Sequence, residues 1–552
     1  MKNKLIIWLL SLVSIASILS SCQKKLEEYN PSDLTANTVF NKAIGFETLV
    51  DAAYSYSRYW YGKEEGYSLT EMGTDIWTNG SGDVYPQLST YNNLQGNNTG
   101  ALDLEWNNFY AAINLCNTGI AQVGGVADYT ATQKTTREAE LRFLRAFYYW
   151  HIVETWGGVH YSTKASDGVI TTANRSPVDS FYNLIFTDLQ YAATNLPATT
   201  TSYGRVTIPV AKAFLARAYL SHGMNAPAIA MANDVIKNYG FTLLPNYADL
   251  WDMSKLKNKE VIWAIDYSTN LALNDLATSS FPTGHSRGSN SGHLMFGMVY
   301  DQVNTGILIR DIPNGRPFNR YMPTLALLDM FDEKNDSRFN ASFQSTWLVN
   351  KAATGFAIND TAAYCPKGTW TTAQKAAKKY TTYDYSAVYG TGGVPSQRKF
   401  YISLKKFLDP TRTSVAEAQS ARDAYVIRLA ELYLIAAEAE VNISKPDSAA
   451  YYVNILRTRA ATPGNVAAMQ VLPAQMNIDF ILDERARELC GEQLRWFDLK
   501  RTGKLIDRIK TKNLNPDAAT FVQTYHLLRP IPQSQIDAVT NKTEFKQNPG
   551  YQ

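Results

Sequence analysis

The sequence predicts a mainly α-helical protein, in which a tetratricopeptide-like helical scaffold carries a large loop-rich insertion. Three features of the 552-residue chain support this fold class. Apolar residues follow helical spacing over roughly 40–60 and 105–240, and again over 420–510. Residues 260–420 are rich in Gly, Ser, Thr, Asn and Tyr, with few helical stripes. A weak internal repeat occurs on both sides of this middle segment.

The densest aromatic stretch, LRFLRAFYYWHIVETWGGVHY at 141–161, could form either a ligand platform or a core. It reads as a helix, because no Pro or Gly interrupts it before Gly157. Only Arg145 is charged between residues 143 and 153. A helix that is apolar nearly all round is buried on most sides, so we predict core packing for these rings and for His151.

The repeat appears first in VAKAFLARAYLSHGMNAPAIAMANDVI. It places Ala216, Tyr219 and Ala228 where the two helices of a tetratricopeptide unit cross, because small residues allow close approach and the tyrosine fills the groove. RLAELYLIAAEA, followed after a turn by SAAYYVNILRTRA, is a second candidate about two hundred residues later. We therefore expect one scaffold interrupted by the looped segment, and such insertions often form the binding face.

The N-terminus has the layout of a bacterial lipoprotein signal. Two lysines precede an apolar run at 5–19, which is too short to span a bilayer comfortably, and Leu-Ser-Ser leads into Cys22. This arrangement predicts removal of residues 1–21 and acylation of Cys22 by diacylglycerol and chains such as palmitate, with residues 22–40 as a tether. A plain signal peptide with an incidental cysteine is the alternative.

The charge balance gives no reason to expect a nucleic-acid partner. The chain has 53 basic and 50 acidic residues, a formal net charge of +3, and loss of two lysines with residues 1–21 leaves +1. Nucleic-acid binding needs clustered positive charge. Cys116, Cys365 and Cys490 are widely spaced and form no CxxC pair, so one disulfide is the most they allow and no metal site is predicted.

One motif resembles a catalytic signature. GHSRG at 284–288 fits the G-x-S-x-G elbow with Ser286 as the nucleophile, but neither a strand pattern before it nor a helix pattern after it is present. HExxH, Walker and dinucleotide-binding motifs do not occur. Asp483 and Glu484 stand near Arg485 and Arg487, which favours charge pairing over catalysis. We therefore predict neither catalytic residues nor a cofactor.

Several segments in a specific order resemble the SusD/RagB family of lipoproteins over nearly the whole mature chain. They are the lipobox at Cys22, LRFLRAFYYWHIVETWGGVHY, VAKAFLARAYL, MPTLALLDMFDEKNDSRF, RLAELYLIAAEAE, ILDERARELCGEQLRWFDLKRTG, HLLRPIPQSQI and QNPGY. One departure is CGEQLRW, where many members have Glu-Gly before the Arg; it lies in the scaffold. On this resemblance we divide the mature chain into a helical part at 41–260, an inserted subdomain at 261–420 and a helical part at 421–552.

The resemblance implies a binding protein of the Bacteroidetes outer membrane, not an enzyme. Such a protein captures nutrient glycans and acts as a lid on a SusC-like TonB-dependent transporter, with its helical repeats toward the partner. Glu27 and Glu28 resemble the family signal for display on the outer leaflet. Three alternatives stay open: a RagB-like protein that captures peptides, a surface hydrolase that uses Ser286, and an adhesin without a small ligand.

The ligand site is predicted in EMGTDIWTNGSGDVYPQLSTYNN, residues 71–93, which lacks helical periodicity. Trp77 is the first choice for a ring that stacks on sugar and Tyr85 the second, with Asn79 and Asp83 as partners for hydroxyl groups. The family uses the loop at this point for ligand contacts, and its Thr-Asp element matches Thr74 and Asp75. The inserted segment is expected to contribute from the same side through Tyr300, Arg310 and Tyr321. The alternative for Trp77 is packing under its own loop.

Overall fold

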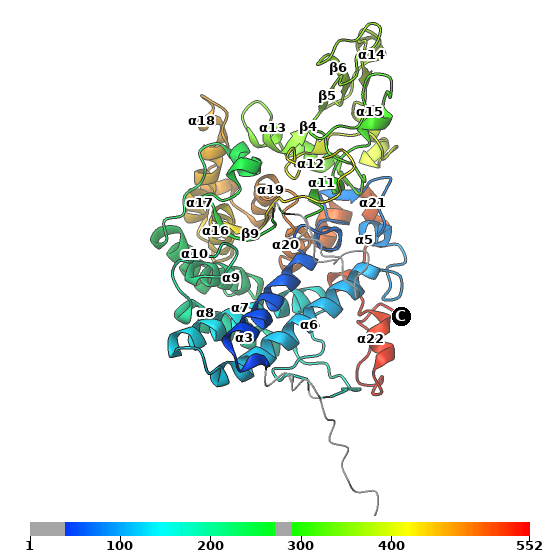
Figure 1. Ribbon diagram of the computed structural model, residues 1–552. Helices are drawn as coiled ribbons and strands as arrows, with labels where there is room; N and C mark the ends of the chain where they lie inside the picture. Colours follow the sequence, from blue (N-terminus) through cyan, green and yellow to red (C-terminus); the bar gives the residue numbers. More distant parts are fainter. Residues whose placement is uncertain (1–38, 167, 269, 271–289) are drawn as a thin grey trace, which may run out of the picture.

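The computed structural model describes residues 39–552 except 167, 269 and 271–289, so the predicted lipobox at Cys22 and the GHSRG motif with Ser286 lie outside the described residues. Helices make up about half of the described chain and far more of it than the short strands, and a loop-rich part projects beyond them at the top of Figure 1. The mainly α fold class predicted from the sequence is confirmed.

Helix α7 (Ala131–Trp156) contains the aromatic stretch and is a core helix, as predicted. A capping box at Thr130 begins it, and Gly157, with φ of 72°, ends it. Every residue from 143 to 156 is buried, His151 included. The rings of this helix therefore pack against one another and against neighbouring helices.

The one charge in the centre of this helix is neutralised inside the protein. Arg145 donates to both carboxylate oxygens of Asp188, at 2.8 and 2.9 Å, and to the amide oxygen of Asn117 at 2.9 Å. These bonds satisfy a guanidinium that would otherwise be costly to bury. Of the two rings that the sequence left open, Trp156 is buried and Tyr161 is half-buried.

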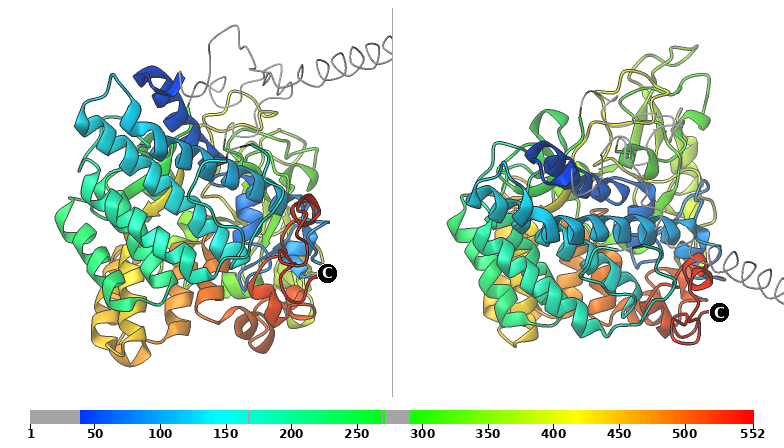
Figure 2. Two further views of the ribbon diagram at one scale, coloured as in Figure 1. Left: turned by 90° about the horizontal axis from the view of Figure 1, so that it is seen from below. Right: turned by 60° about the horizontal axis from the view of Figure 1, so that its bottom comes forward.

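The scaffold is a series of helices, each packed against the next (Figure 2). Its helices besides α7 are α3 (Ala43–Ser55), α6 (Gly100–Gln122), α8 (Val178–Asn195), α9 (Ile208–Ser221), α10 (Asn225–Asn238), α16 (Leu429–Asn442) and α17 (Pro446–Ala460). The pairs α9–α10 and α16–α17 are the two units of the predicted repeat, and α10 packs directly on α16.

The two repeat units therefore stack in space although the chain leaves the scaffold between them. Asn442 at the end of α16 donates to Asn225 at the start of α10 at 3.0 Å, across 217 residues of sequence. Ala216 and Ala228 are fully buried and Tyr219 is 7% exposed, as expected for residues at helix crossings. Contacts between distant parts of the chain, which no local pattern encodes, thus join the two halves of the tetratricopeptide-like scaffold.

The loop-rich segment leaves and rejoins the scaffold through one antiparallel pair, β2 (Val261–Ile265) and β9 (Ala424–Arg428). Between them lie the short strands β3 (Tyr321–Pro323), β4 (Phe343–Gln344), β5 (Thr346–Leu348), β6 (Thr361–Tyr364), β7 (Thr381–Thr382) and β8 (Ser403–Leu404). The short helices there are α11 (Gly292–Met295), α12 (Leu325–Asp329), α13 (Arg338–Ser342), α14 (Thr372–Ala376) and α15 (Tyr385–Val388). None of these elements is longer than five residues.

The C-terminal part carries α18 (Val466–Met469), α19 (Ile478–Glu488), α20 (Arg495–Arg501), α21 (Pro516–Ala519) and α22 (Gln533–Ala538). The N-terminal part adds α4 (Glu64–Thr70), β1 (Trp77–Asn79) and α5 (Pro86–Thr90). Strand β1 pairs with β3 of the inserted segment, Trp77 opposite Pro323 and Asn79 opposite Tyr321. This pairing fixes the predicted ligand loop against the inserted segment.

Buried ion pairs join the inserted segment to α19. Arg338 contacts Asp336 at 2.7 Å, Glu484 at 2.8 Å and Glu488 at 2.9 Å, and Glu484 also pairs with Arg487 at 2.7 Å. Burial alone would raise the pKa of Glu484, but the surrounding guanidinium groups hold it well below its usual range. Charge pairing, as predicted for this stretch, is confirmed for Glu484.

Cys116, Cys365 and Cys490 are buried free thiols. Across the described part of the chain, no helix is both long and apolar enough to cross a membrane. The same residues contain no group of three or more His, Cys, Asp or Glu side chains that could hold a metal ion.

Candidate functional site

Two of the rings predicted to contact ligand are core residues. Trp77 is 0% exposed, and its ring lies 4.9 Å from that of Phe296 in an edge-to-face arrangement. Tyr321 is also 0% exposed; its hydroxyl donates to the carbonyl of Glu64 and bonds Ser68. The prediction that they stack on ligand is wrong for this structure, because the β1–β3 pairing turns both rings inward.

Tyr300 and Asp75 are buried as well. The Tyr300 hydroxyl donates to the carbonyl of Gly315 at 2.9 Å, so the residue holds its own loop together. Asp75 is fully buried and accepts from Arg495 and Arg508. Neither side chain can meet a ligand directly, and their predicted roles as contacts are wrong here. Asp75 instead positions Arg508, which lines a cavity between α12 and α19.

Thr74, next to Asp75, is buried too, and its hydroxyl donates to the carbonyl of Glu71 at 2.7 Å. The family element Thr74-Asp75 is therefore structural in this chain. Arg310 differs, because it lies at the surface and pairs with Asp301 at 2.6 Å. Its guanidinium is available from solvent, but the structure does not bring it together with the loop at 79–85.

The other predicted residues of that loop are partly exposed. Asn79 accepts from Arg398 through both its carbonyl and its side-chain oxygen, at 2.8 and 2.9 Å. Asp83 accepts from the backbone N–H of Tyr85 at 2.9 Å and from the Ser89 hydroxyl at 2.9 Å. These bonds fix the loop, and Tyr85 on the same loop is half-buried.

Phe318 and Arg320 lie beside this loop and are not among the residues that the sequence pattern predicts for the site. The Arg320 guanidinium lies 5.0 Å from the centre of the Phe318 ring, pairs with Glu64 at 2.6 Å and donates to the carbonyl of Gly82. Burial raises the pKa of Glu64 to about 7, although Arg320 opposes the shift. No local pattern marks these residues, because the contacts of Arg320 with Glu64 and Gly82 connect segments more than two hundred residues apart.

We call this surface the loop face. It consists of Asn79, Asp83, Tyr85, Phe318, Arg320 and Arg398, all partly exposed. Two rings, one amide, one carboxylate and two guanidinium groups meet there. Such a set can contact the apolar C–H faces of a sugar and hydrogen-bond its hydroxyl groups.

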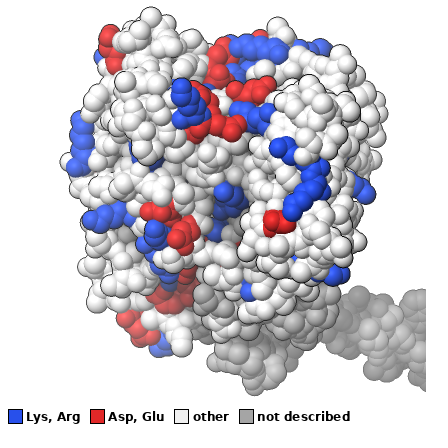
Figure 3. Space-filling view, turned by 90° about the horizontal axis from the view of Figure 1, so that it is seen from above, with Lys and Arg blue, Asp and Glu red and all other residues white. Residues whose placement is uncertain are grey.

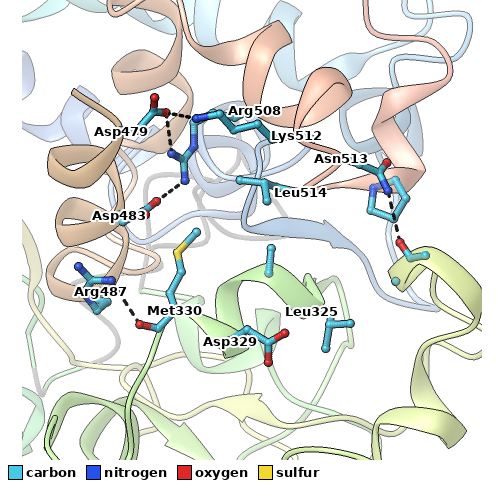
Figure 4. Close-up of a pocket in the computed structure, with 14 residues that line it drawn as sticks. Leu325, Asp329, Met330, Asp479, Asp483, Arg487, Arg508, Lys512, Asn513 and Leu514 are labelled. Atoms are coloured by element: carbon cyan, nitrogen blue, oxygen red, sulfur yellow. Dashed lines mark hydrogen bonds and ion pairs between the residues drawn. The ribbon is translucent and has the colours of Figure 1, made fainter. Parts of the chain in front are cut away.

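A cavity of about 570 Å³ opens between α12 of the inserted segment and α19 of the C-terminal part (Figure 4). We call it the charged cavity, because its lining carries three acids and three bases, namely Asp329, Asp479, Asp483, Arg487, Arg508 and Lys512. Leu325, Met330, Leu514 and Pro516 provide the apolar lining. No aromatic side chain lines it among the residues that the structure describes.

Ion pairs organise the charged cavity. Arg508 reaches across from the buried Asp75 to Asp479 at 3.1 Å and to Asp483, and Lys512 pairs with Asp479 at 2.6 Å. Partial burial would raise the pKa of Asp479, but its lysine partners lower it to about 2. The cavity thus presents both signs of charge at neutral pH, which suits hydroxyl groups or a ligand that itself carries both signs.

Helix α21 connects the charged cavity to the loop face. Pro516 lines the cavity, and the neighbouring Asp517 accepts from Thr78 at 2.6 Å and from Arg398 at 2.8 Å. On the side seen in Figure 3, acidic and basic side chains are interspersed and no large region carries one sign alone. The arrangement provides hydrogen-bonding groups without a strong net field.

Comparisons with known proteins agree with this architecture. A family model described as "SusD family" matches residues 259–551, and one described as "Starch-binding associating with outer membrane" matches residues 24–220. SusD-like protein P2 of Formosa agariphila is 27% identical, covering 95% of this chain and 96% of its own. SusD-like protein P25 of the same organism is 25% identical, covering 96% and 97%.

Solved structures show the same fold. A laminarin binding SusD-like protein is 23% identical with a TM-score of 0.70, covering 92% of this chain and 100% of its own. Surface glycan-binding protein A from Bacteroides thetaiotaomicron, in complex with laminarihexaose, is 19% identical with a TM-score of 0.66, covering 92% and 99%. The description of the second family model associates its members with the outer membrane. Because the SusD model matches more than half of its residues, this chain belongs to the SusD family.

Proposed function

We propose that this protein is a lipid-anchored, outward-facing lipoprotein that captures a nutrient glycan and delivers it to a SusC-like TonB-dependent transporter. The lipobox at Cys22 supports the anchor, and family membership supports the outer membrane and the partner. The named ligands of two proteins with the same fold, laminarin and laminarihexaose, support a glycan. The protein acts by binding and carries out no catalytic step.

The observation that carries the proposal is the composition of the loop face. Tyr85 and Phe318 offer partly exposed rings to the C–H faces of a sugar, and Arg320 contacts both the Phe318 ring and the carboxylate of Glu64. Asn79 and Asp83 add acceptors on a loop whose backbone is fixed by hydrogen bonds. A pre-formed site of this kind loses little conformational entropy when ligand binds.

The charged cavity favours a second candidate, capture of peptides. It presents acids and bases together, as a zwitterionic peptide with free termini would require. Calorimetry with both ligand classes separates the candidates. Laminarihexaose and other neutral oligosaccharides should bind on the glycan proposal, whereas only short peptides should bind on the alternative.

The site is tested with Tyr85→Ala and Arg320→Ala, in protein that retains its unfolding transition. We expect the loss of the Tyr85 ring to weaken oligosaccharide binding by about 1–3 kcal/mol, or about 5- to 150-fold, on the scale for stacking a ring on an aromatic side chain. Tyr451→Ala is the matched control, since Tyr451 is 65% exposed on α17 in the scaffold. Full affinity in both loop-face variants would place the site elsewhere.

A further inference from the structure

A second cavity, of about 390 Å³, lies between α6, the chain that follows α7, and α22. It shares no lining residue with the charged cavity. Four aromatic side chains border it, namely Trp106 and Tyr110 on α6, Tyr149 on α7 and Phe545 near the C-terminus. Tyr110 is half-buried and is the most accessible of them, whereas Trp106, Tyr149 and Phe545 are 5%, 0% and 1% exposed and form the base of the cavity. We call it the aromatic cavity. Its volume falls within the about 300–1,000 Å³ of small-molecule sites.

The rings form a rigid wall. Trp106 lies 4.8 Å from Tyr110, 5.0 Å from Trp156 and 6.2 Å from Phe545, measured between ring centres. Trp106, Tyr110, Ile113 and further lining residues repeat at helical spacing, so one face of α6 supplies them. Trp106 is only 5% exposed, so its ring is held in place by these neighbours.

The polar lining has unused hydrogen-bonding capacity. Asn114, His160 and Gln535 line the cavity, and the printed side-chain hydrogen bonds of each use only one of its two polar atoms, namely Asn114 Oδ1, His160 Nδ1 and Gln535 Nε2. Burial lowers the pKa of His160, so its ring is neutral at pH 7. Lys164 is the one charged side chain among the lining residues described. These groups suit an uncharged ligand with several hydroxyl groups.

The chain that follows α7 forms the outer wall of the cavity and includes the lining residues Ser162, Lys164 and Ala173. Hydrogen bonds hold this wall at both ends, so the cavity exists without ligand. The side-chain N–H₂ of Asn117 donates to the carbonyls of Ser162 and Lys164, at 3.1 and 3.2 Å. At the other end, Asn541 accepts from the backbone N–H of Ala173 at 3.1 Å and donates to its carbonyl at 2.7 Å. A pre-formed cavity avoids the cost of ordering its walls on binding.

We propose that the aromatic cavity is a second carbohydrate-binding site, which takes one or two uncharged sugar rings separately from the loop face. The half-buried Tyr110 ring supplies apolar contact for a C–H face, and the amides of Asn114 and Gln535 and the imidazole of His160 supply partners for hydroxyls. The proposal rests on the proposed function for the class of ligand but not for the position of the first site.

Filling the cavity tests the proposal. Ala538 lines it from the exposed side of α22, so Ala538→Trp introduces bulk without removing a core contact, and Ala538→Ser is the matched control. The probes are laminarihexaose and short neutral gluco-, manno- and galacto-oligosaccharides at millimolar concentration. Native mass spectrometry counts bound molecules, and amide exchange monitors residues 160–166, 170–176 and 533–539.

We expect two bound equivalents and slower exchange at these segments in the wild type and in Ala538→Ser. Ala538→Trp should lose one equivalent together with that protection, whereas Arg320→Ala should lose the other equivalent and keep the protection. Unaltered stoichiometry in Ala538→Trp, or no protection with any probe, overturns the second site. If the loop-face equivalent alone is missing, or if Arg320→Ala still binds both equivalents, the result contradicts the proposed position of the first site and not the second site. The two failures are therefore distinguishable.

Discussion

Replacement of Trp77 by Ala tests whether the loop at 71–93 acts through its tryptophan or through its exposed side chains. Trp77 is 0% exposed and packs edge-to-face on Phe296. A buried Trp removes about 150–250 Å² from water, which at about 25 cal/mol per Å² corresponds to about 4–6 kcal/mol as an upper bound. The indole N–H of Trp77 has no partner in the described chain, so its removal breaks no hydrogen bond. Burial of an unpaired N–H costs free energy in the wild type, and relief of that cost offsets part of the figure.

We therefore expect Trp77→Ala to lower the free energy of unfolding by about 3–5 kcal/mol, as for other large rings removed from cores. Trp77→Phe keeps a ring against Phe296 and should lose less. The backbone bonds of β1 remain in both variants, so the m-value in urea unfolding should not change. Oligosaccharide affinity measured on the folded fraction should persist. An unchanged unfolding midpoint together with lost binding would refute this reasoning and restore Trp77 as the stacking ring.

Two further predictions concern the anchor and pH. Cys22→Ser should leave the protein unacylated, because a hydroxyl cannot replace the thiolate in the lipidation step, and membrane fractionation as firm as that of the wild type would contradict this. Burial lowers the pKa of His151 from 6.5 to about 3, so its contribution to stability is complete above about pH 6.5 and is lost as pH falls toward 3, at about 1.4 kcal/mol per unit. From pH 6 to pH 5, the free energy of unfolding of the wild type should fall by about 1.2 kcal/mol relative to that of His151→Phe in urea unfolding, because the unfolded histidine is already partly protonated at pH 6. Parallel profiles of the two proteins would count against this prediction.

Local patterns predicted the scaffold because its physical basis is local. A helix with only Arg145 charged along its centre has no broad polar face that could be exposed to solvent. Its burial could therefore be predicted from the composition of one segment. The crossing residues Ala216, Tyr219 and Ala228 were identified by spacing within one helical pair. What spacing could not provide was the contact of α10 with α16, although the interrupted repeat indicated that both units belong to one scaffold.

The site was predicted less well, because its geometry depends on distant pairings. The partner of Trp77 in β3 lies 246 positions later, as 323 minus 77, and this pairing decides that the ring turns inward. Arg508, which Asp75 holds in the charged cavity, lies 433 positions from it. A loop rich in Gly and Asn indicates an exposed segment but does not specify which of its side chains face solvent. Only Asn79, Asp83 and Tyr85 of the predicted loop contacts remain accessible.

A capture protein must also release what it binds, and the distribution of rings suits that requirement. Most of the aromatic side chains stabilise the core, so the loop face keeps only Tyr85 and Phe318 partly exposed, and each accessible ring contributes modest affinity. With a second weak site in the aromatic cavity, a long glycan could occupy both sites of one molecule and gain avidity through effective concentration, provided its length spans the distance between them. A short fragment reaches one site only and dissociates faster. On these two proposals, retention would depend on glycan length, and dissociation rates measured over a series of oligosaccharides should fall steeply at the length that first bridges both sites, but not in Ala538→Trp.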